Sequence, residues 1–291
     1  MSFVPDIRLD NHPYSISVKL VGMKLLNGLE LADYIKERQA KQVRTLRQAH
    51  ATVPRLAIVQ TIDDPVIDTY VKKLKQQYAE DILVTADHYK VSQEELMPTI
   101  ERLNADDAVH GIIIQLPLAD PTTTDDAVRA VSPLKDVDGL GEAPVFDPAT
   151  ALAINWLCAG YNIELEKHKI LIVGNGRLVG APLARMWQNS GFDVTVVDSK
   201  VEDLAYECQQ ASLIVSGTGV PGLIKSDMVR PETVLIDAGT VAESGVIVGD
   251  LSPDLYERHD LIITPQKGGV GPLTVCALFE NVIRAAHATT S

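Results

Sequence analysis

The chain has 291 residues, more than one hydrophobic core usually serves, so two domains are expected. Hydrophobic residues make up 46% and charged residues 22%, the balance of an ordinary soluble globular protein. A net charge of −13 argues against nucleic acid as the main partner, because phosphate binding requires a basic surface. No apolar run approaches membrane-spanning length and no signal-peptide core precedes the domains, so we expect a cytoplasmic protein with no membrane partner.

The first half of the chain alternates helical and strand-like segments. Charged periodic stretches predict helices, and short apolar runs predict strands. In chain order, the prediction is a helix over 31–46, a strand over 55–59, a helix over 69–79, a strand over 82–85, a helix over 92–103, a strand over 111–115 and a helix over 125–131. Ser92 and Glu95 have capping-box spacing at the start of the third helix. Strands separated by helices imply a parallel sheet with right-handed crossovers.

The second half repeats this alternation after a loop-like stretch over 133–148. An apolar helix over 150–159 is predicted to join two domains. The predicted strands that follow it are 169–173, 194–197, 213–216, 234–237 and 261–264. A last helix, over 273–286, is expected to return to the first domain. This half therefore predicts a doubly wound nucleotide-binding domain.

The residue types that hold metals show no useful spacing. Cys158, Cys208 and Cys276 lie far apart, and the seven histidines are scattered. We therefore expect buried free thiols and no metal site.

The segment from Lys169 to Asp198 has the order of a dinucleotide site. An apolar strand ends at Gly174 and Gly176, Gly180 opens a helix, and a second apolar strand ends at Asp198. Small residues let the backbone approach a pyrophosphate, and the helix start offers unpaired N–H groups to the anion. The glycine spacing alone is weak evidence, because tight turns also require glycine. The flanking strands and the position of Asp198 fit the cofactor interpretation as well and strengthen it.

Five further motifs occur in order along the chain. They are Gly111–Leu118, Lys135–Gly139, Val179–Pro182, Leu235–Gly239 and Thr264–Thr274. Together they resemble the bifunctional methylenetetrahydrofolate dehydrogenase/methenyltetrahydrofolate cyclohydrolase family. The resemblance extends from about residue 25 to residue 286, nearly the whole chain.

The resemblance implies two α/β domains with a cleft between them. Residues 1–149 would form the catalytic, folate-binding domain, completed by a C-terminal helix over 273–291, and residues 150–272 the NAD(P)-binding Rossmann domain. The implied reaction is hydride transfer from 5,10-methylenetetrahydrofolate to a nicotinamide, followed by hydrolysis of the methenyl product to 10-formyltetrahydrofolate. Members of the family are usually homodimers.

The same resemblance implies roles for three residues in the folate domain. Asp138 falls at the pterin-binding position, where one carboxylate can accept from a ring N–H and an exocyclic amine. Gln115 ends a buried strand, where α/β proteins bind ligands, and would orient a catalytic lysine. Tyr70 would pack on the aminobenzoyl ring. Asp136, in the same loop as Asp138, is expected to be structural.

The catalytic lysine is where this chain departs from the family pattern. The usual lysine stands four residues after the tyrosine, but here that position is Leu74. A π-bulge would bring Lys75 onto the Tyr70 face, whereas Lys73 would serve through ordinary i, i+3 proximity. A third alternative is that no lysine reaches the site.

The cofactor preference depends on two short segments. Members of the family that use NADP carry Arg-Ser after the first glycine, but this chain has Asn175 and Gly176. The second strand ends in Asp198 and Ser199, and a carboxylate there accepts from a ribose 2′-OH and repels a 2′-phosphate. We therefore predict a preference for NAD, with Arg177 as the residue that would rescue NADP binding.

Other predicted contacts rest on position within the family pattern. The predicted cofactor-binding set is Thr150, Gly174, Asn175, Gly176, Arg177, Asp198, Ser199, Thr218, Gly219, Gly239, Thr240 and Thr274. The predicted substrate-binding set is Tyr70, Gln115, Asp138, Gly268, Gly269 and Pro272. The glycines of the second set allow unusual backbone angles and a close approach of the ligands.

Three alternatives to the bifunctional enzyme stay open. The chain would be a dehydrogenase without cyclohydrolase activity if no lysine served the hydrolysis. It would be a non-catalytic folate- and dinucleotide-binding relative if Gln115 and Asp138 served binding alone. A two-domain dehydrogenase acting on shikimate or an amino acid is disfavoured by the loops 135–139 and 268–272.

Overall fold

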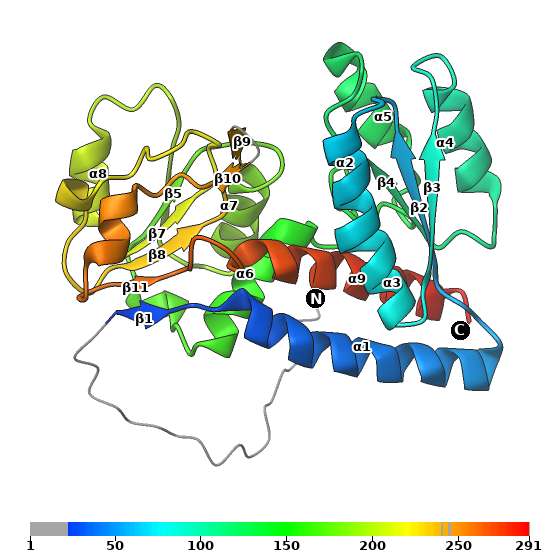
Figure 1. The fold of residues 1–291 in the computed structure, drawn as a ribbon, viewed down its shortest axis with the longest axis horizontal. Coiled ribbons are helices and arrows are strands. Elements are labelled where there is room, and N and C mark those ends of the chain that lie inside the picture. Colours follow the sequence, from blue (N-terminus) through cyan, green and yellow to red (C-terminus); the bar gives the residue numbers. More distant parts are fainter. Residues whose placement is uncertain (1–22, 240, 244–245, 291) are drawn as a thin grey trace.

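The buried apolar runs form two separate parallel sheets in the computed structural model, which describes residues 23–239, 241–243 and 246–290 (Figure 1). We call the smaller sheet with its helices α2–α5 the N-terminal lobe, and the larger sheet with α7 and α8 the C-terminal lobe. Helices α1, α6 and α9 run between and beneath them (Figure 1). The predicted α/β class with parallel sheets is confirmed.

The N-terminal lobe is built on three parallel strands in the order β3-β2-β4. Its strands are β2 (Arg55–Gln60), β3 (Thr85–Lys90) and β4 (Gly111–Ile114). Its helices are α2 (Pro65–Tyr70), α3 (Gln77–Asp81), α4 (Leu96–Ala105) and α5 (Thr124–Ala130). β2 and β4 are buried because they are covered on both faces, which explains their continuous apolar runs.

The predicted strand over 82–85 is wrong, because β3 begins only at Thr85. Ile82 and Val84 are buried, but they belong to the turn after α3, where Leu83 has a φ of 65°. The strand itself is the edge of the sheet, and its sequence TADHYK is polar and half-buried. The apolar signal therefore marked a buried turn, and the true strand lacked that signal because its outer edge faces solvent.

The start of α4 also differs from its prediction. Ser92 and Glu95 form the reciprocal bonds of a capping box: the Ser92 N–H donates to Glu95 Oε2 at 3.0 Å and the Glu95 N–H donates to Ser92 Oγ at 3.3 Å. The helix itself begins at Leu96, because residues 93–95 form a turn first.

The C-terminal lobe has a six-stranded sheet in the order β1-β11-β8-β7-β5-β6, with every pair parallel. Its strands are β1 (Lys24–Leu25), β5 (Ile170–Val173), β6 (Val194–Val197), β7 (Leu213–Ser216), β8 (Val234–Asp237) and β11 (Ile262–Ile263). Its helices are α7 (Gly180–Asn189) and α8 (Leu204–Gln210), and β9 (Val241–Glu243) pairs with β10 (Val246–Val248) in antiparallel orientation. The strand order reverses on the two sides of β5, so the doubly wound prediction is confirmed and the ligand crevice is expected there.

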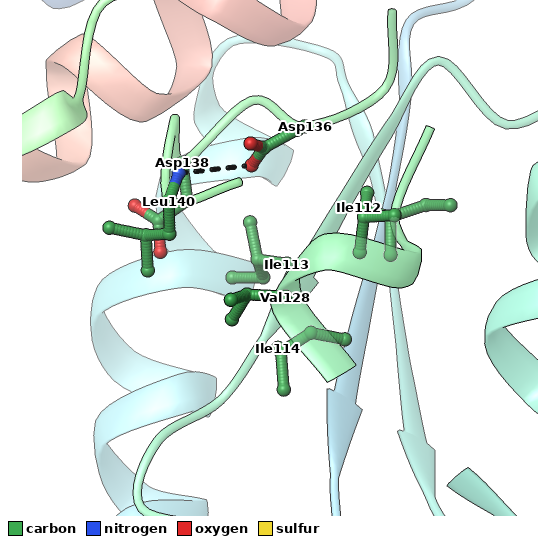
Figure 2. Close-up of a pocket in the computed structure, with 8 residues that line it drawn as sticks. Ile112, Ile113, Ile114, Val128, Asp136, Asp138 and Leu140 are labelled. Atoms are coloured by element: carbon green, nitrogen blue, oxygen red, sulfur yellow. Dashed lines mark hydrogen bonds between the residues drawn. The ribbon is translucent and has the colours of Figure 1, made fainter. Parts of the chain in front are cut away.

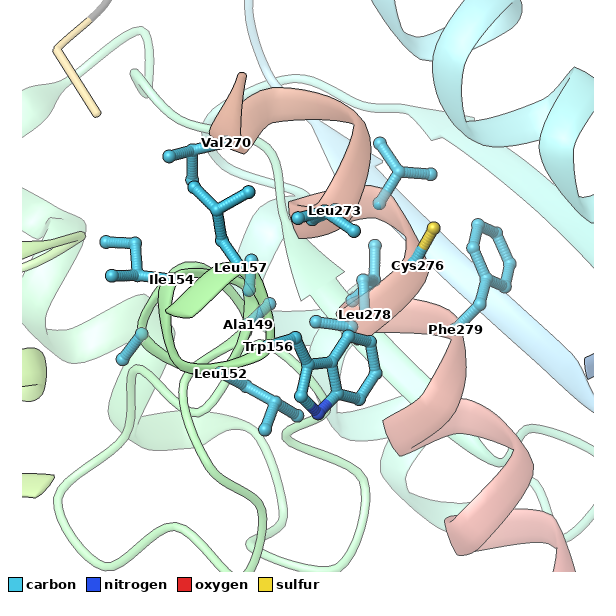
Figure 3. Packing of buried hydrophobic residues seen from close by; sticks show 14 of the residues in the cluster. Ala149, Leu152, Ile154, Trp156, Leu157, Val270, Leu273, Cys276, Leu278 and Phe279 are labelled. Atoms are coloured by element: carbon cyan, nitrogen blue, oxygen red, sulfur yellow. The ribbon is translucent and has the colours of Figure 1, made fainter. Parts of the chain in front are cut away.

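The longest helices connect the two lobes through one hydrophobic core. α9 (Val270–Ala288) packs against α1 (Gly28–His50) and α6 (Ala149–Gly160). Figure 3 shows Leu157 and Trp156 of α6 facing Leu273 and Leu278 of α9. α9 is apolar on most sides because it is buried between these helices and the N-terminal sheet.

Two features of composition can be compared with the structure. The three cysteines are buried and free, as expected. Within residues 23–239, 241–243 and 246–290, no helix combines the length and apolar character needed to cross a membrane.

Candidate active site

A π-helix places Lys75 at the centre of the N-terminal lobe's candidate site. α2 ends at Tyr70, and residues Val71–Gln76 form the π-helix, in which the Gln77 N–H donates to the carbonyl of Lys72, five residues earlier. Lys75 Nζ then lies 5.8 Å from the centroid of the Tyr70 ring. The π-bulge interpretation is confirmed for Lys75, whereas Lys73 is exposed.

The start of this helical segment is fixed by its own sequence. Asp64 caps α2 by accepting from the N–H groups of Val66 at 2.6 Å and Ile67 at 3.4 Å, and Pro65 occupies the first turn. Farther along, Asp68 accepts from Gln60 Nε2 at 2.8 Å and pairs with Lys90. The helix that carries Tyr70 is therefore held to β2 and β3 before the π-helix begins.

Gln115 meets Lys75 from the neighbouring strand. It follows β4 directly, and its N–H donates to the carbonyl of Val59 at 2.8 Å, which extends the sheet by one bond. Its Oε1 accepts from Lys75 Nζ at 2.9 Å, and its Nε2 donates to the carbonyl of Leu116 at 3.0 Å. Both ends of the amide are thus engaged, which sets its orientation.

Asp138 belongs to a loop that three side chains hold in place. Asp136 is buried and accepts from the N–H groups of Gly139 at 3.0 Å, Leu140 at 3.3 Å and Gly141 at 2.8 Å. Figure 2 shows Asp136 bonded across the loop to Leu140, with Asp138 beside it. The expectation that Asp136 is structural is confirmed by these bonds.

The other two side chains connect the loop to two different helices, α4 and α9. Lys135 Nζ donates to three carbonyls at the end of α4, those of Leu103, Asn104 and Asp106, at 2.7–3.1 Å. Asn281 of α9 is buried and donates through Nδ2 to the carbonyl of Val137 at 2.9 Å. Sequence reasoning missed Asn281, because nothing local marks a contact that spans 144 residues.

Lys75 and Asp138 are coupled through a low-dielectric site. Burial raises the pKa of the Asp138 carboxyl, and the charge of Lys75 opposes that rise. Burial lowers the pKa of the Lys75 amine, and the charge of Asp138 opposes that fall. A buried amine and a buried carboxyl that influence each other beside an aromatic ring form the kind of cluster that marks functional sites.

A second site lies at the carboxyl ends of the C-terminal strands. A pocket of about 460 Å³ there is lined by six of the predicted cofactor residues, namely Gly174, Asn175, Gly176, Asp198, Ser199 and Thr218. Gly174 has a φ of 98°, and a Cβ on it would lie 2.9 Å from the Gly217 carbonyl. A Cβ on Gly176 would meet nothing within 4 Å. Backbone without side chains therefore faces the open space of the pocket, beside β5, where the strand order reverses.

Asp250 supports this pocket and was missed from the sequence. It is buried, and its Oδ2 accepts from Ser216 Oγ at 2.6 Å, from the Thr218 N–H at 2.6 Å and from Thr218 Oγ1 at 2.9 Å. A Cβ on Gly239 would overlap the Asp250 carboxylate, so Gly239 serves packing beside the pocket. The nearby Asp237 carboxyl has a pKa raised to about 6 by burial.

The Arg177 side chain extends from the glycine loop toward the N-terminal lobe. Its Nη2 donates to Asp125 Oδ1 in the first turn of α5. Asp198 stays at the pocket, where its Oδ1 accepts from the Lys200 N–H at 2.9 Å. The one arginine of the glycine loop therefore points toward the N-terminal lobe, while the carboxylate after β6 faces the pocket.

The remaining predicted residues occupy helix starts and turns. Thr150 lies in the first turn of α6, and Gly219 has a φ of 71° in the loop after β7. Thr240 lies outside the described residues. The other predicted residues lie at or just before the start of α9: Gly268, Gly269, Pro272 and Thr274. In the part of the chain that the structure describes, no group of three or more His, Cys, Asp or Glu is placed to hold a metal ion.

Comparisons with known proteins match both halves of the chain to one family. Residues 26–138 match the family model described as the catalytic domain of tetrahydrofolate dehydrogenase/cyclohydrolase. Residues 148–290 match the model described as its NAD(P)-binding domain. Bifunctional protein FolD of Campylobacter jejuni strain RM1221 is 37% identical over 278 residues, which cover 91% of this chain and 98% of that protein. FolD of Exiguobacterium sibiricum is 34% identical over 276 residues, which cover 90% of this chain and 99% of that protein.

Solved structures give the same result. The FolD enzyme of C. jejuni matches with a TM-score of 0.85 at 34% identity, covering 92% of this chain and 99% of that one. The Trypanosoma brucei enzyme, complexed with NADP cofactor and an inhibitor, matches with a TM-score of 0.85 at 28% identity. The match covers 92% of this chain and 98% of that one. Shikimate 5-dehydrogenase of Thermus thermophilus, with a TM-score of 0.52 at 14% identity, shares the fold alone. The resemblance found in the motifs is confirmed: the chain belongs to the tetrahydrofolate dehydrogenase/cyclohydrolase family.

Proposed function

We propose that this protein oxidises 5,10-methylenetetrahydrofolate to 5,10-methenyltetrahydrofolate by hydride transfer to NAD(P), and then hydrolyses the product to 10-formyltetrahydrofolate. The observation that carries this proposal is the contact of Lys75 Nζ with Gln115 Oε1 at 2.9 Å, beside Tyr70 and Asp138. The family membership and the bifunctional names of relatives that match nine-tenths of the chain support the same reaction pair.

The folate would be held by two of these side chains. Asp138 would accept hydrogen bonds from the pterin ring N–H and its exocyclic amine, which suits one carboxylate facing two donors. Tyr70 keeps 40% of its surface exposed, so its ring has a free face for the aminobenzoyl group. The predicted loop residues Gly268, Gly269 and Pro272 would close the other side of the substrate.

The dinucleotide fits the C-terminal pocket. Gly176 leaves open space where a pyrophosphate would approach, and Gly174, Asn175 and Thr218 line the same pocket. When bound, the nicotinamide accepts the hydride from the one-carbon bridge of the folate. The chain's own contribution to that step is positional: the two lobes hold the two reactants so that the carbon atoms lie within reach.

Lys75 would serve the hydrolysis. Its burial lowers the pKa of the amine, so the neutral form is reached closer to neutral pH than in water. The neutral amine can accept a proton from the water that attacks the methenyl carbon. Gln115 holds Nζ in place for this transfer.

The finer features of the enzyme are proposals as well. We propose that NAD is preferred to NADP, because Asp198 lines the pocket where a 2′-phosphate would lie. The division into residues 1–149 with 273–291 and residues 150–272 is proposed for the two domains. A homodimer, implied by the family, and a cytoplasmic location, expected from the sequence composition, stay predictions.

One spectrophotometric experiment tests the activity. The protein is mixed with 5,10-methylenetetrahydrofolate and either dinucleotide, while reduced dinucleotide and methenyl absorbance are followed together. We expect reduced dinucleotide with little methenyl accumulation, since hydrolysis follows. Accumulation of the methenyl compound would leave a monofunctional dehydrogenase. Folate binding without either product would refute catalysis and favour a binding relative.

A further inference from the structure

The contact between Arg177 and Asp125 connects the dinucleotide pocket to the opposite lobe. Arg177 directly follows Gly176, which lines the pocket, and Asp125 lies 52 residues away in sequence in the first turn of α5. Both side chains remain accessible, at 38% exposure for Arg177 and 54% for Asp125. An exposed ion pair is weak and exchanges partners readily, so either side chain can be drawn to a stronger ligand.

The charges around the pocket make that exchange depend on the ligand. A ribose 2′-phosphate carries negative charge beside the end of β6, where Asp198 would repel it. An arginine in the glycine loop can offset this repulsion by a bidentate contact with the phosphate. While Arg177 is engaged by Asp125, its guanidinium is directed toward α5 rather than the pocket. A ribose 2′-OH makes no such demand on the arginine.

We propose that Asp125 is a specificity-determining residue, which holds Arg177 away from the 2′-phosphate position and so favours NAD over NADP. Binding of NADP requires Arg177 to exchange the Asp125 carboxylate for the phosphate, which opens an ion pair between the two lobes. Binding of NAD leaves the ion pair closed. This inference rests on the proposed dinucleotide site and adds to it a residue from the other lobe.

The test measures binding of NAD and NADP by calorimetry, without folate, to four proteins: wild type, Asp125→Asn, Arg177→Ala and the double variant. We expect Asp125→Asn to tighten NADP binding by about two- to five-fold, the range of an exposed ion pair, and to change NAD binding by less than about two-fold. Arg177→Ala should weaken NADP binding and remove the effect of Asp125→Asn.

Asp126→Asn is the matched control, because Asp126 neighbours Asp125 on α5, is exposed and carries the same charge. An equal gain for NADP in this control would reduce the effect to net charge and overturn the proposal. Equal gains for NAD and NADP in Asp125→Asn, or an unchanged gain in the double variant, would also overturn it. If the four proteins bind NAD and NADP as expected but the wild type shows no turnover, the proposed reaction is refuted and this inference is still supported. Absence of binding by both dinucleotides would refute both.

Discussion

Replacing Lys75 tests the central chemical argument, because a neighbouring lysine provides its control. Lys75→Met keeps the length of the apolar stem and removes the amine that contacts Gln115 Oε1 at 2.9 Å. A positioned proton-transfer group contributes about 10²–10⁴-fold in rate, so cyclohydrolase turnover should fall by that factor, about 3–5 kcal/mol in activation free energy. Lys73→Met removes the same charge from an exposed position and should change the rate by less than about two-fold.

The assay follows loss of methenyl absorbance in single turnovers at several pH values. Burial lowers the pKa of Lys75 below its ordinary 10.5, so the wild-type rate should rise with pH through an inflection below that value. Lys75→Met should lack the inflection. Dehydrogenase activity should fall less, since hydride transfer depends on position. Unimpaired hydrolysis in Lys75→Met, with its folded state verified by thermal unfolding, would refute the catalytic role of the amine.

Three further substitutions test binding and stability. Asp138→Asn should weaken binding of a tetrahydrofolate by about 10–100-fold in calorimetry, because charge-assisted hydrogen bonds are lost. Asn281→Ala should lower the free energy of unfolding in urea by about 1–3 kcal/mol, because the carbonyl of the buried Val137 loses its donor, together with that of the exposed Asp147. Asp237 binds a proton more tightly when folded, with a pKa of about 6 against 3.8, so its contribution to stability is full below pH 3.8 and is lost as pH rises through 6. Between pH 4 and 7, wild type should lose about 2 kcal/mol relative to Asp237→Asn, because part of the loss has already occurred by pH 4.

Each of these expectations has an outcome that contradicts it. Unchanged folate affinity in Asp138→Asn would place the pterin elsewhere. A loss below about 1 kcal/mol in Asn281→Ala would mean that water replaces the amide. Parallel pH profiles for wild type and Asp237→Asn would show that this carboxyl titrates normally in the folded protein.

The sequence predicted the sheets best where strands are buried on both faces. β2, β4, β5, β7 and β8 each read as a short apolar run, because helices cover both sides of a parallel sheet. β1 has only two residues and pairs with β11, more than 230 positions away, so no local pattern announces it. The strand predicted over 82–85 was also wrong because of missing local information: a buried turn and a buried strand give the same apolar pattern.

The site shows a similar division between local and distant information. Gln115 and Asp138 were predicted from their motifs, and both lie beside Lys75. Other contacts lie far apart in sequence: Asn281 holds the Asp138 loop, and Asp250 holds Thr218 at the dinucleotide pocket. Together with the Arg177–Asp125 pair, these contacts join residues 32–144 positions apart. Contacts of that separation are decided by the packing of whole lobes, so a single sequence cannot reveal them.

The choice between Lys73 and Lys75 is decided by the core as much as by the site. An extra residue in an α-helix rotates everything after it by about 100°, which would turn either Tyr70 or the end of the helix away from its partners. Beyond the π-helix, Ala79 is buried and Tyr78 donates to Gln39 Oε1 at 2.7 Å while stacking on Phe279 of α9. The π-helix absorbs the extra residue between α2 and α3, so the side chains of both helices keep the orientations that their contacts require. Lys75 therefore reaches Gln115 because the packing on α9 fixes one end of the segment and the Asp64 cap fixes the other.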